Sequence, residues 1–422
     1  MQTPIRFIGP FLLGIVLIVF PSSAYSEEPL LRVSGYMKGF FLVLDPADIE
    51  GDLEALHQPA EGLAIQRARV KLFYQPMDRV SAELAYELVP VVVGDASLIE
   101  EAGLLGTYTQ KIPYRLADLD RQLYPAPGED VESFILAHNL DRAFVTLSPP
   151  FADFYIGRQP LSFGVARAVN PTDIFMPFTF TELDKEEKTG VDALRARVPL
   201  GDMGELDVGV VFGHECDPKK SAAFLNAKVY VLKTDLTLMN IAFQENMLFG
   251  VNLARAVWEA GFYLEAAYTF AGLLNEPQPE QDYFRLSTGL DYHFSKGVYV
   301  FLEYHFSGAS QGSPENYLTQ LGETAFQEGG VYLLGRHYLI PGISYEITPL
   351  LTADAEVLIN VGDGSALFAP RLVYNFMEDV YLEAGVYVPV GQHARVAGLV
   401  LEPESEFGLY PTVYFTSVRL YF

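Results

Sequence analysis

Apolar and polar residues alternate in steps of two along most of the chain. In the stretch 63–75, the charged residues Arg67, Arg69 and Lys71 share one phase of the alternation. The intervening positions are apolar or aromatic: Ala68, Val70, Leu72 and Tyr74. A period of two is that of a β-strand, whose successive side chains point to opposite faces, whereas a helix would spread the three cations around its axis. The pattern therefore predicts a strand with one charged and one apolar face.

The same two-faced pattern recurs in later segments. Glu83 and Glu87 share a phase in the stretch 80–88, so neighbouring strands offer cations and carboxylates to the same side. Further polar phases contain Arg195, Arg197, Asn226, Lys228, Arg285, Asp291, His293, Glu303, His305, Asp354 and Glu356. Because buried unpaired charges are costly, this side must be wet or internally paired. A barrel with a polar lumen and an apolar exterior satisfies that requirement.

Short turns and longer connections alternate between the predicted strands. Eight short turns fall near 76–78, 149–152, 201–203, 233–235, 257, 295–297, 348–349 and 377–379. Nine connections, most of them longer, fall near 44–62, 89–140, 160–188, 214–220, 244–246, 271–281, 308–331, 362–364 and 389–406. Short periplasmic turns and long extracellular loops are typical of transmembrane barrels. The predicted fold class is all-β: a transmembrane antiparallel β-barrel of about 18 strands, within a range of 16 to 18, wide enough for an aqueous channel.

The final stretch, 410–422, alternates in the same way and ends on an aromatic residue. One phase carries Tyr414, Thr416, Val418, Leu420 and Phe422, and the other carries Ser417 and Arg419. An amphipathic final strand with a terminal aromatic resembles the assembly signal of Gram-negative outer-membrane β-barrels, whose last strand closes against the first. The resemblance implies that Tyr414, Leu420 and Phe422 form this signal and that the barrel assembly machinery is a partner.

A second resemblance lies in a strand end and the loop that follows it. Ile156-Gly-Arg-Gln159 precedes Asn170-Pro-Thr-Asp173, and this order is similar to a hairpin and loop of porin-like outer-membrane proteins. Asn, Pro and Asp are turn and cap formers, so the first interpretation of the loop motif is structural. The alternative is that the loop 160–188 folds into the lumen and narrows it.

A loop inside the lumen would create a charged constriction. The candidates are Arg67, Arg69, Lys71, Arg158, Arg167, Arg195 and Arg197, facing Glu83, Glu87 and the acidic residues of 182–187. Opposed charges of this kind set ion preference in pores. Salt bridges that only stiffen the wall are the competing interpretation. The connection 89–140 could be a second constriction, a plug or a surface lid.

The N-terminus has the order of a secretory signal peptide. Arg6 precedes the apolar run 7–20, and small residues at 22–26 follow it. This order predicts a signal peptide over 1–26, cleaved after Ser26, and a single barrel domain over 27–422. The expected destination is the outer membrane, where lipid and lipopolysaccharide would surround the barrel.

Composition removes several classes of function. The net charge of −26 excludes nucleic acid as a natural partner, because phosphate binding needs a basic surface. Cys216 is the single cysteine, so no internal disulfide can form. The histidines lack metal-ligand spacing, and we predict neither a metal site nor a cofactor.

These observations favour a porin, monomeric or homotrimeric, that passes small hydrophilic solutes by diffusion. The alternative is a surface barrel whose loops plug the pore and bind a partner or divalent cations. A lipid-modifying enzyme is a third hypothesis, since His293/Ser295 and His305/Ser307 have the spacing of such barrel enzymes. Both histidines lie on the polar phase, away from lipid, so we predict no catalytic residue and no enzyme activity.

Overall fold

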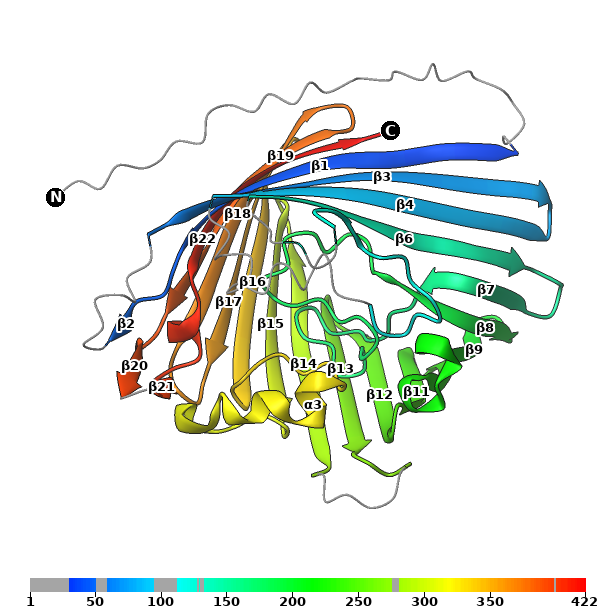
Figure 1. The fold of residues 1–422 in the computed structure, drawn as a ribbon. Coiled ribbons are helices and arrows are strands. Elements are labelled where there is room, and N and C mark those ends of the chain that lie inside the picture. The colour runs from blue at the N-terminus through cyan, green and yellow to red at the C-terminus, as the bar shows by residue number, and fades with distance from the viewer. Residues whose placement is uncertain are drawn as a thin grey trace.

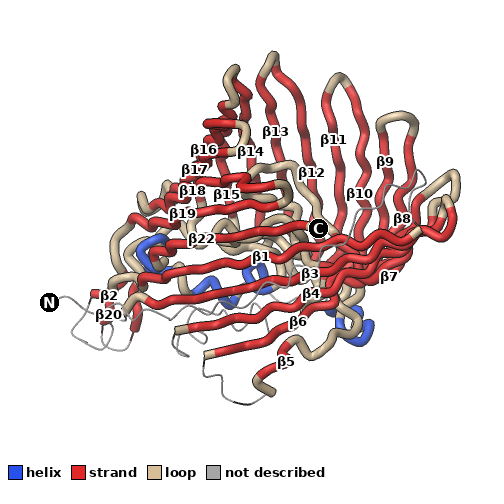
Figure 2. The backbone as a smooth tube through the Cα atoms, turned by 90° about the horizontal axis from the view of Figure 1, so that it is seen from above, coloured by secondary structure: helices blue, strands red, loops and turns tan. Residues whose placement is uncertain are grey.

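The chain folds into a closed barrel. The computed structural model describes residues 30–50, 59–94, 112–126, 129, 133–274, 281–397 and 400–422. Within these residues, 18 antiparallel strands each pair with their neighbours along the chain, and the last strand pairs with the first (Figures 1 and 2). This arrangement confirms the predicted fold class and strand number. The predicted signal peptide, 1–26, lies outside the described residues.

The barrel strands are β1 (Leu31–Asp45), β3 (Glu61–Met77), β4 (Val80–Val93), β6 (Phe134–Leu147), β7 (Asp153–Pro160), β8 (Gly190–Leu200), β9 (Gly204–Val211), β10 (Ala222–Val231), β11 (Thr234–Phe243), β12 (Asn246–Val257), β13 (Ala260–Phe270), β14 (Tyr283–Phe294), β15 (Val298–Ser307), β16 (His337–Thr348), β17 (Leu351–Asn360), β18 (Ala366–Met377), β19 (Val380–Val390) and β22 (Thr412–Tyr421). The connections contain β2 (Ile49–Glu50), β5 (Gln122–Tyr124), β20 (Ala394–Ala397), β21 (Val400–Glu402), η2 (His214–Cys216), η3 (Pro218–Lys220), η4 (Pro314–Asn316), η5 (Thr319–Gly322), α3 (Thr324–Gln327) and η6 (Phe407–Leu409). No helix in the described part of the chain is long and apolar enough to cross a membrane.

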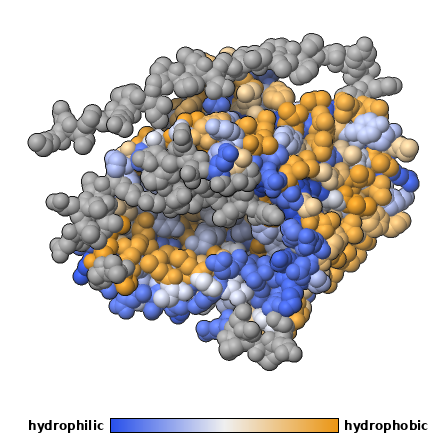
Figure 3. Space-filling model, in the orientation of Figure 1, coloured by the Kyte–Doolittle hydropathy of each residue, from blue (hydrophilic) through white to orange (hydrophobic). Residues whose placement is uncertain are grey.

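The two faces of the strands divide as the alternation predicts. Apolar residues of one phase are exposed on the outside, among them Val70, Leu84, Leu194, Leu290 and Leu302. Charged residues of the other phase, such as Arg69, Glu87 and Glu303, are enclosed by the barrel. Figure 3 shows hydrophobic residues spread over the strands at the right of the view and hydrophilic residues gathered at its lower centre. The barrel thus has an apolar belt around a polar interior.

The closing strand has the predicted place. In the β1–β22 pair, Met37 lies opposite Leu420 and Val43 lies opposite Tyr414. Tyr414 and the terminal Phe422 are both exposed on the outside. An assembly signal needs a strand at the closing seam, which is where β22 lies. The role of β22 as that signal stays a prediction.

The predicted connection 89–140 is too long. β4 continues to Val93 and β6 begins at Phe134, so both strands extend into the predicted loop. At this end the lumen-facing side chains are apolar as well, because other parts of the chain cover them. The covered cluster contains Phe40, Leu42, Leu63, Ile65, Val89, Val91, Val93, Ile135 and Phe415. The continuous apolar run 89–93 therefore lacks the alternation from which the other strands were predicted.

Candidate functional site

The connection between β7 and β8, residues 161–189, lies inside the ring of strands (Figure 1), and we call it the lumen loop. One end of it is fixed by Glu303 of β15. This buried carboxylate accepts hydrogen bonds from the backbone N–H groups of Arg167 (2.7 Å), Ala168 (3.1 Å) and Val169 (2.9 Å). The charge of Glu303 is thus balanced by three oriented backbone dipoles, a strong form of hydrogen bonding.

A second buried carboxylate, Glu265 of β13, fixes the adjoining residues. It accepts hydrogen bonds from the N–H groups of Val165 (2.7 Å) and Ala166 (3.1 Å). It also accepts from both the N–H and the hydroxyl of Thr172, each at 2.7 Å. Thr172 belongs to the Asn170-Pro-Thr-Asp173 motif, so this motif anchors the loop to the wall.

The other end of the lumen loop reaches β1 and β3. The Asp184 carboxylate accepts hydrogen bonds from Lys38 Nζ (2.9 Å) and Arg67 Nη1 (2.7 Å), and Lys38 also contacts Glu186. Burial opposes the charge of Asp184, but Arg67 and Lys38 outweigh it and hold its pKa below the usual range. Since β13 and β15 lie well apart from β1 and β3 in the ring, the loop crosses the lumen.

The described part of the preceding connection, 112–126, supports the lumen loop. The buried Arg115 donates to Gly190 O (3.0 Å), Asp118 (2.9 Å) and Asn139 (2.8 Å). Burial, together with the charge of Arg158, lowers the pKa of Arg115 to about 10. The ring of Tyr114 packs edge-on against Phe175 of the loop, with centroids 5.1 Å apart. This segment therefore lies on the lumen side of the barrel wall.

Every predicted constriction cation has a carboxylate partner. The pairs are Arg67–Glu87 (2.8 Å), Arg69–Asp141 (2.7 Å), Lys71–Glu83 (3.2 Å), Arg158–Asp192 (2.7 Å), Arg167–Asp291 (2.6 Å), Arg195–Asp207 (2.5 Å) and Arg197–Glu205 (2.7 Å). This arrangement matches the salt-bridge interpretation of the wall. The effect of these pairs on ion preference remains a prediction.

The structure brings only some of these residues to the lumen loop. Arg67 contacts Asp184, and Arg69 lies 3.7 Å from Glu187. Arg167 belongs to the loop itself and reaches Asp291 of β14. Arg195 and Arg197 instead pair with residues of the adjacent β9, and Lys71 pairs with Glu83 across β3 and β4. The structure therefore brings Arg67, Arg69 and Arg167 to the lumen loop, whereas Lys71, Arg195 and Arg197 pair between adjacent strands.

Several residues around the loop were not predicted. Lys38 is fully buried. In the sequence its neighbours on the same face of the strand are the aromatic residues Tyr36 and Phe40, so the pattern did not indicate a charged face there. Arg371 of β18 and Arg419 of β22 both pair with Glu383 of β19. Their alternation was visible in the sequence, but only the closed ring shows that they face the lumen loop.

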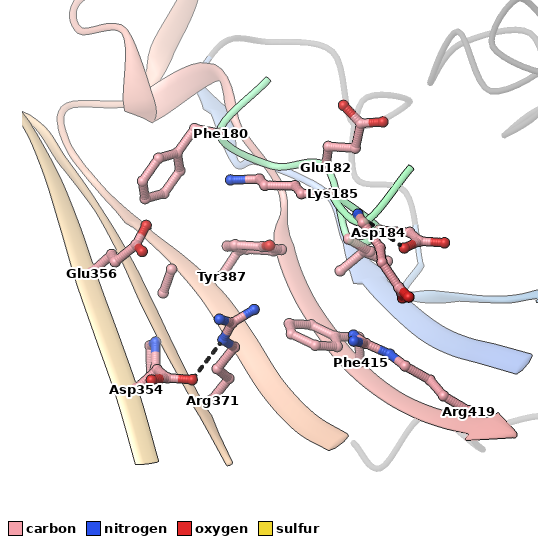
Figure 4. A pocket seen from close by; sticks show the side chains of 14 residues that line it. Phe180, Glu182, Asp184, Lys185, Asp354, Glu356, Arg371, Tyr387, Phe415 and Arg419 are labelled. Atoms are coloured by element: carbon pink, nitrogen blue, oxygen red, sulfur yellow. Dashed lines mark hydrogen bonds and ion pairs between the residues drawn. The ribbon is translucent and has the colours of Figure 1, made fainter. Parts of the chain in front are cut away.

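A cavity of about 380 Å³ remains between the lumen loop and the wall formed by β17, β18, β19 and β22 (Figure 4). Its lining residues are Phe180, Glu182, Leu183, Asp184, Lys185, Glu186, Asp354, Glu356, Ala369, Pro370, Arg371, Tyr387, Phe415 and Arg419. Arg371 is held by Asp354 at 3.1 Å across the floor of the cavity. This volume suits a small solute, and charges of both signs line it.

His305 and Ser307 are each hydrogen-bonded to a residue other than its pair partner. His305 Nδ1 lies 2.8 Å from Ser287 Oγ, and Ser287 donates to Val169 O of the lumen loop (2.6 Å). Ser307 accepts a hydrogen bond from Ser310 (2.8 Å). Among the described residues, no group of three or more His, Cys, Asp or Glu side chains could hold a metal ion.

The sequence matches no protein-family model and no curated protein. The fold, in contrast, matches solved outer-membrane barrels. Acinetobacter baumannii OccAB4 superposes with a TM-score of 0.56 at 10% identity, over 94% of this chain and 99% of that chain. The BenF-like porin from Pseudomonas fluorescens Pf-5 gives 0.55 at 9%, over 93% and 98%. The Pseudomonas aeruginosa outer membrane protein opdK gives 0.51 at 9%, over 93% and 98%. The described chain has the fold of these barrels.

Proposed function

We propose that the chain is an outer-membrane channel through which small hydrophilic solutes diffuse past the lumen loop. The observation that carries this proposal is the loop itself, which is tied to Glu265 and Glu303 on one side and to Lys38 and Arg67 on the other. Because specific hydrogen bonds and ion pairs hold the loop on both sides, it narrows the lumen of a wide barrel in a defined position. The charged cavity beside it supplies a wet surface for polar solutes. No bond-breaking chemistry is required.

The comparisons support the same class of function. One of the similar structures is named a porin and another an outer membrane protein. A barrel of this width leaves room for an aqueous path, whereas narrower barrels fill with side chains. The apolar belt of exposed strand residues suits contact with lipid and lipopolysaccharide.

The proposed route to the membrane begins with removal of 1–26 and ends with insertion by the barrel assembly machinery. Tyr414, Leu420 and Phe422 would present the recognised edge of the closing strand. We expect deletion of Phe422 to lower the membrane yield, and a normal yield would contradict this role. The proposed assembled form is a monomer or a homotrimer, and a homotrimer would cover part of the apolar belt.

A plugged surface barrel is the second candidate, because the segment 112–126 also lies inside the barrel. Its Tyr114 packs against Phe175 of the lumen loop, and its Arg115 donates a hydrogen bond to the carbonyl oxygen of Gly190. Two packed segments inside one barrel reduce the space left for solutes. In this case the acidic loops would bind a partner or divalent cations at the surface.

Single-channel recording separates the two candidates. The mature protein is refolded in detergent, checked by its heat-modifiable gel mobility and inserted into a planar bilayer under a potassium chloride gradient. Steady current supports the channel, and the sign of the reversal potential gives its ion preference. Silence from folded, inserted barrel would overturn the channel proposal in favour of the plugged barrel.

A further inference from the structure

We propose that the cavity beside the lumen loop is a binding site for small organic ammonium ions, and that Lys185 occupies it as a tethered competing cation. The inference rests on the proposed channel function and names the class of solute that the same site would take. It follows from the charges that remain after the ion pairs around the cavity are assigned, and from the aromatic residues beside them.

Most charged groups of the lining already have partners. Asp184 is held by Lys38 and Arg67, and Glu186 is held by Lys38. Arg371 lies 3.1 Å from Asp354 and 3.6 Å from Glu383. Arg419 pairs with Glu383 as well. These groups shape the walls, and their charges are largely compensated within the protein.

Three charged residues of the lining are left over. Glu182 and Glu356 form no ion pair with any described residue, and neither does Lys185. These two carboxylates therefore face one ammonium, which leaves one negative charge in excess among the three residues at the cavity. Figure 4 shows Lys185 extending toward the side of the cavity where Glu356 lies. The cavity thus favours a second cation over an anion.

Aromatic residues indicate the kind of cation. Lys185 Nζ lies 5.3 Å from the centroid of the Phe180 ring, which is within the range of a cation–π contact. Tyr387 and Phe415 stack on each other in the lining of the same cavity, with ring centroids 5.4 Å apart. Proteins bind alkylammonium groups through cation–π contacts with the faces of aromatic rings, and a carboxylate beside the rings adds attraction for the positive charge. A weakly hydrated organic ammonium ion gains these contacts, whereas a potassium ion keeps its water.

The ammonium of Lys185 is poorly placed to hold the site against a competitor. Burial lowers its pKa, with Glu356 opposing and Arg371 adding to the effect. A lysine side chain is long and flexible in general, and no hydrogen bond to another described side chain fixes that of Lys185 in the cavity. A solute cation can therefore displace it sideways into the lumen, and Lys185 returns when the solute leaves. No covalent step is involved.

The test combines channel block with direct binding, using tetramethylammonium as the probe and Lys185→Gln, Glu356→Gln and Lys219→Gln as variants. Lys219 of η3 is not a lining residue of the cavity and pairs with Glu245 at 3.2 Å. Lys219→Gln therefore removes the same charge as Lys185→Gln, but outside the cavity. We expect Lys185→Gln to strengthen tetramethylammonium block of the potassium current by roughly two- to thirtyfold, the range of a cation–π contact. Glu356→Gln should weaken the block, and Lys219→Gln should leave it unchanged.

Calorimetric titration of the same folded proteins in detergent keeps the inference testable if the channel is silent. A silent barrel that binds tetramethylammonium more tightly after Lys185→Gln would overturn the channel function and support the cation site. A conducting barrel whose block and binding do not respond to Lys185→Gln or Glu356→Gln would overturn the cation site alone. The cation site would also be overturned if the wild type bound benzoate more tightly than tetramethylammonium in the same titration and Lys185→Gln lost this preference. Lys185 would then be a residue that binds anions.

Discussion

The C-terminal residue Phe422 closes the barrel directly against Gly35. The N–H of Gly35 donates to the carbonyl of Phe422 at 2.8 Å, and the N–H of Phe422 donates to the carbonyl of Gly35 at 3.0 Å. A Cβ atom at Gly35 would lie 2.1 Å from the carbonyl oxygen of Arg69 and 2.7 Å from the Phe422 ring. Position 35 therefore accepts only a hydrogen atom, and the aromatic ring covers the backbone at the seam.

We expect Gly35→Ala to lower the fraction of protein that folds, since the methyl group must displace backbone as well as the Phe422 ring. Refolding yield, measured by heat-modifiable gel mobility, checks this expectation. Gly39→Ala is the matched control on the same strand, because a Cβ there would meet only the Phe41 ring at 3.7 Å, an ordinary contact. Equal yields for the two variants would show that the seam tolerates the clash.

The alternation of residues predicts the barrel because each strand must separate lipid from lumen along most of its length. It therefore gave the phase of Arg67, Arg195 and Glu303 and the number of strands. It failed where the lumen face is covered by other chain segments, as at Val89 to Val93, because both faces of the strand are apolar there. The strand boundary was misplaced for this physical reason.

The contacts of the lumen loop were less accessible from the sequence. Glu265 and Glu303 bind backbone N–H groups, which carry no residue-specific signal. The position of Lys38 opposite Asp184 depends on how the ring closes and on where the loop crosses it. Pairing within adjacent strands, such as Arg197 with Glu205, follows from local spacing, whereas pairing across the lumen requires the three-dimensional fold.

The direction of the Arg197 side chain can be tested by labelling. On a Cys216→Ser background, a cysteine at position 197 should react with a membrane-impermeant thiol reagent, because Arg197 is 37% exposed on the lumen side. A cysteine at Leu194, which is exposed on the apolar outer face, should react only with a lipid-soluble reagent in bilayers. The opposite labelling pattern would show that the assigned faces are reversed.

Glu303 should govern how firmly the lumen loop is held. Replacing it with Leu leaves three backbone N–H groups without their acceptor, that of Val169 buried and those of Arg167 and Ala168 partly buried. A buried N–H group without an acceptor costs on the order of 1–3 kcal/mol. We expect the loop to leave its position, which should raise the single-channel conductance and let trypsin cleave the backbone after Arg167 and Lys188.

The matched control is Glu205→Gln, which removes the carboxylate of an ion pair that is about one-third exposed. Its expected cost is at most about 1 kcal/mol, with unchanged conductance. Trypsin resistance and conductance of Glu303→Leu equal to those of the wild type would show that Glu265 and Asp184 alone hold the loop.

The last prediction concerns Glu406, which joins three connections at the loop end of the barrel. Its carboxylate accepts hydrogen bonds from Leu334 N–H (2.8 Å), from Asn360 (2.8 Å) and from the Tyr338 hydroxyl. Asp363, which accepts from the N–H of Glu406 (2.8 Å), is the charged group that faces it. Burial raises the pKa of Glu406 from 4.5 to about 7, with Asp363 adding to the shift.

A carboxyl group whose pKa is higher in the folded state favours folding when it is protonated. Its contribution is complete below about pH 4.5 and is lost as the pH rises through about 7. The loss amounts to roughly 3 kcal/mol, since one pKa unit corresponds to about 1.4 kcal/mol. We therefore expect amide protection in 400–411, corrected for intrinsic exchange rates, to fall between pH 4.5 and pH 8. Glu406→Gln should remove this dependence and Glu402→Gln on β21 should keep it, whereas parallel profiles for wild type and Glu406→Gln would show that another group titrates.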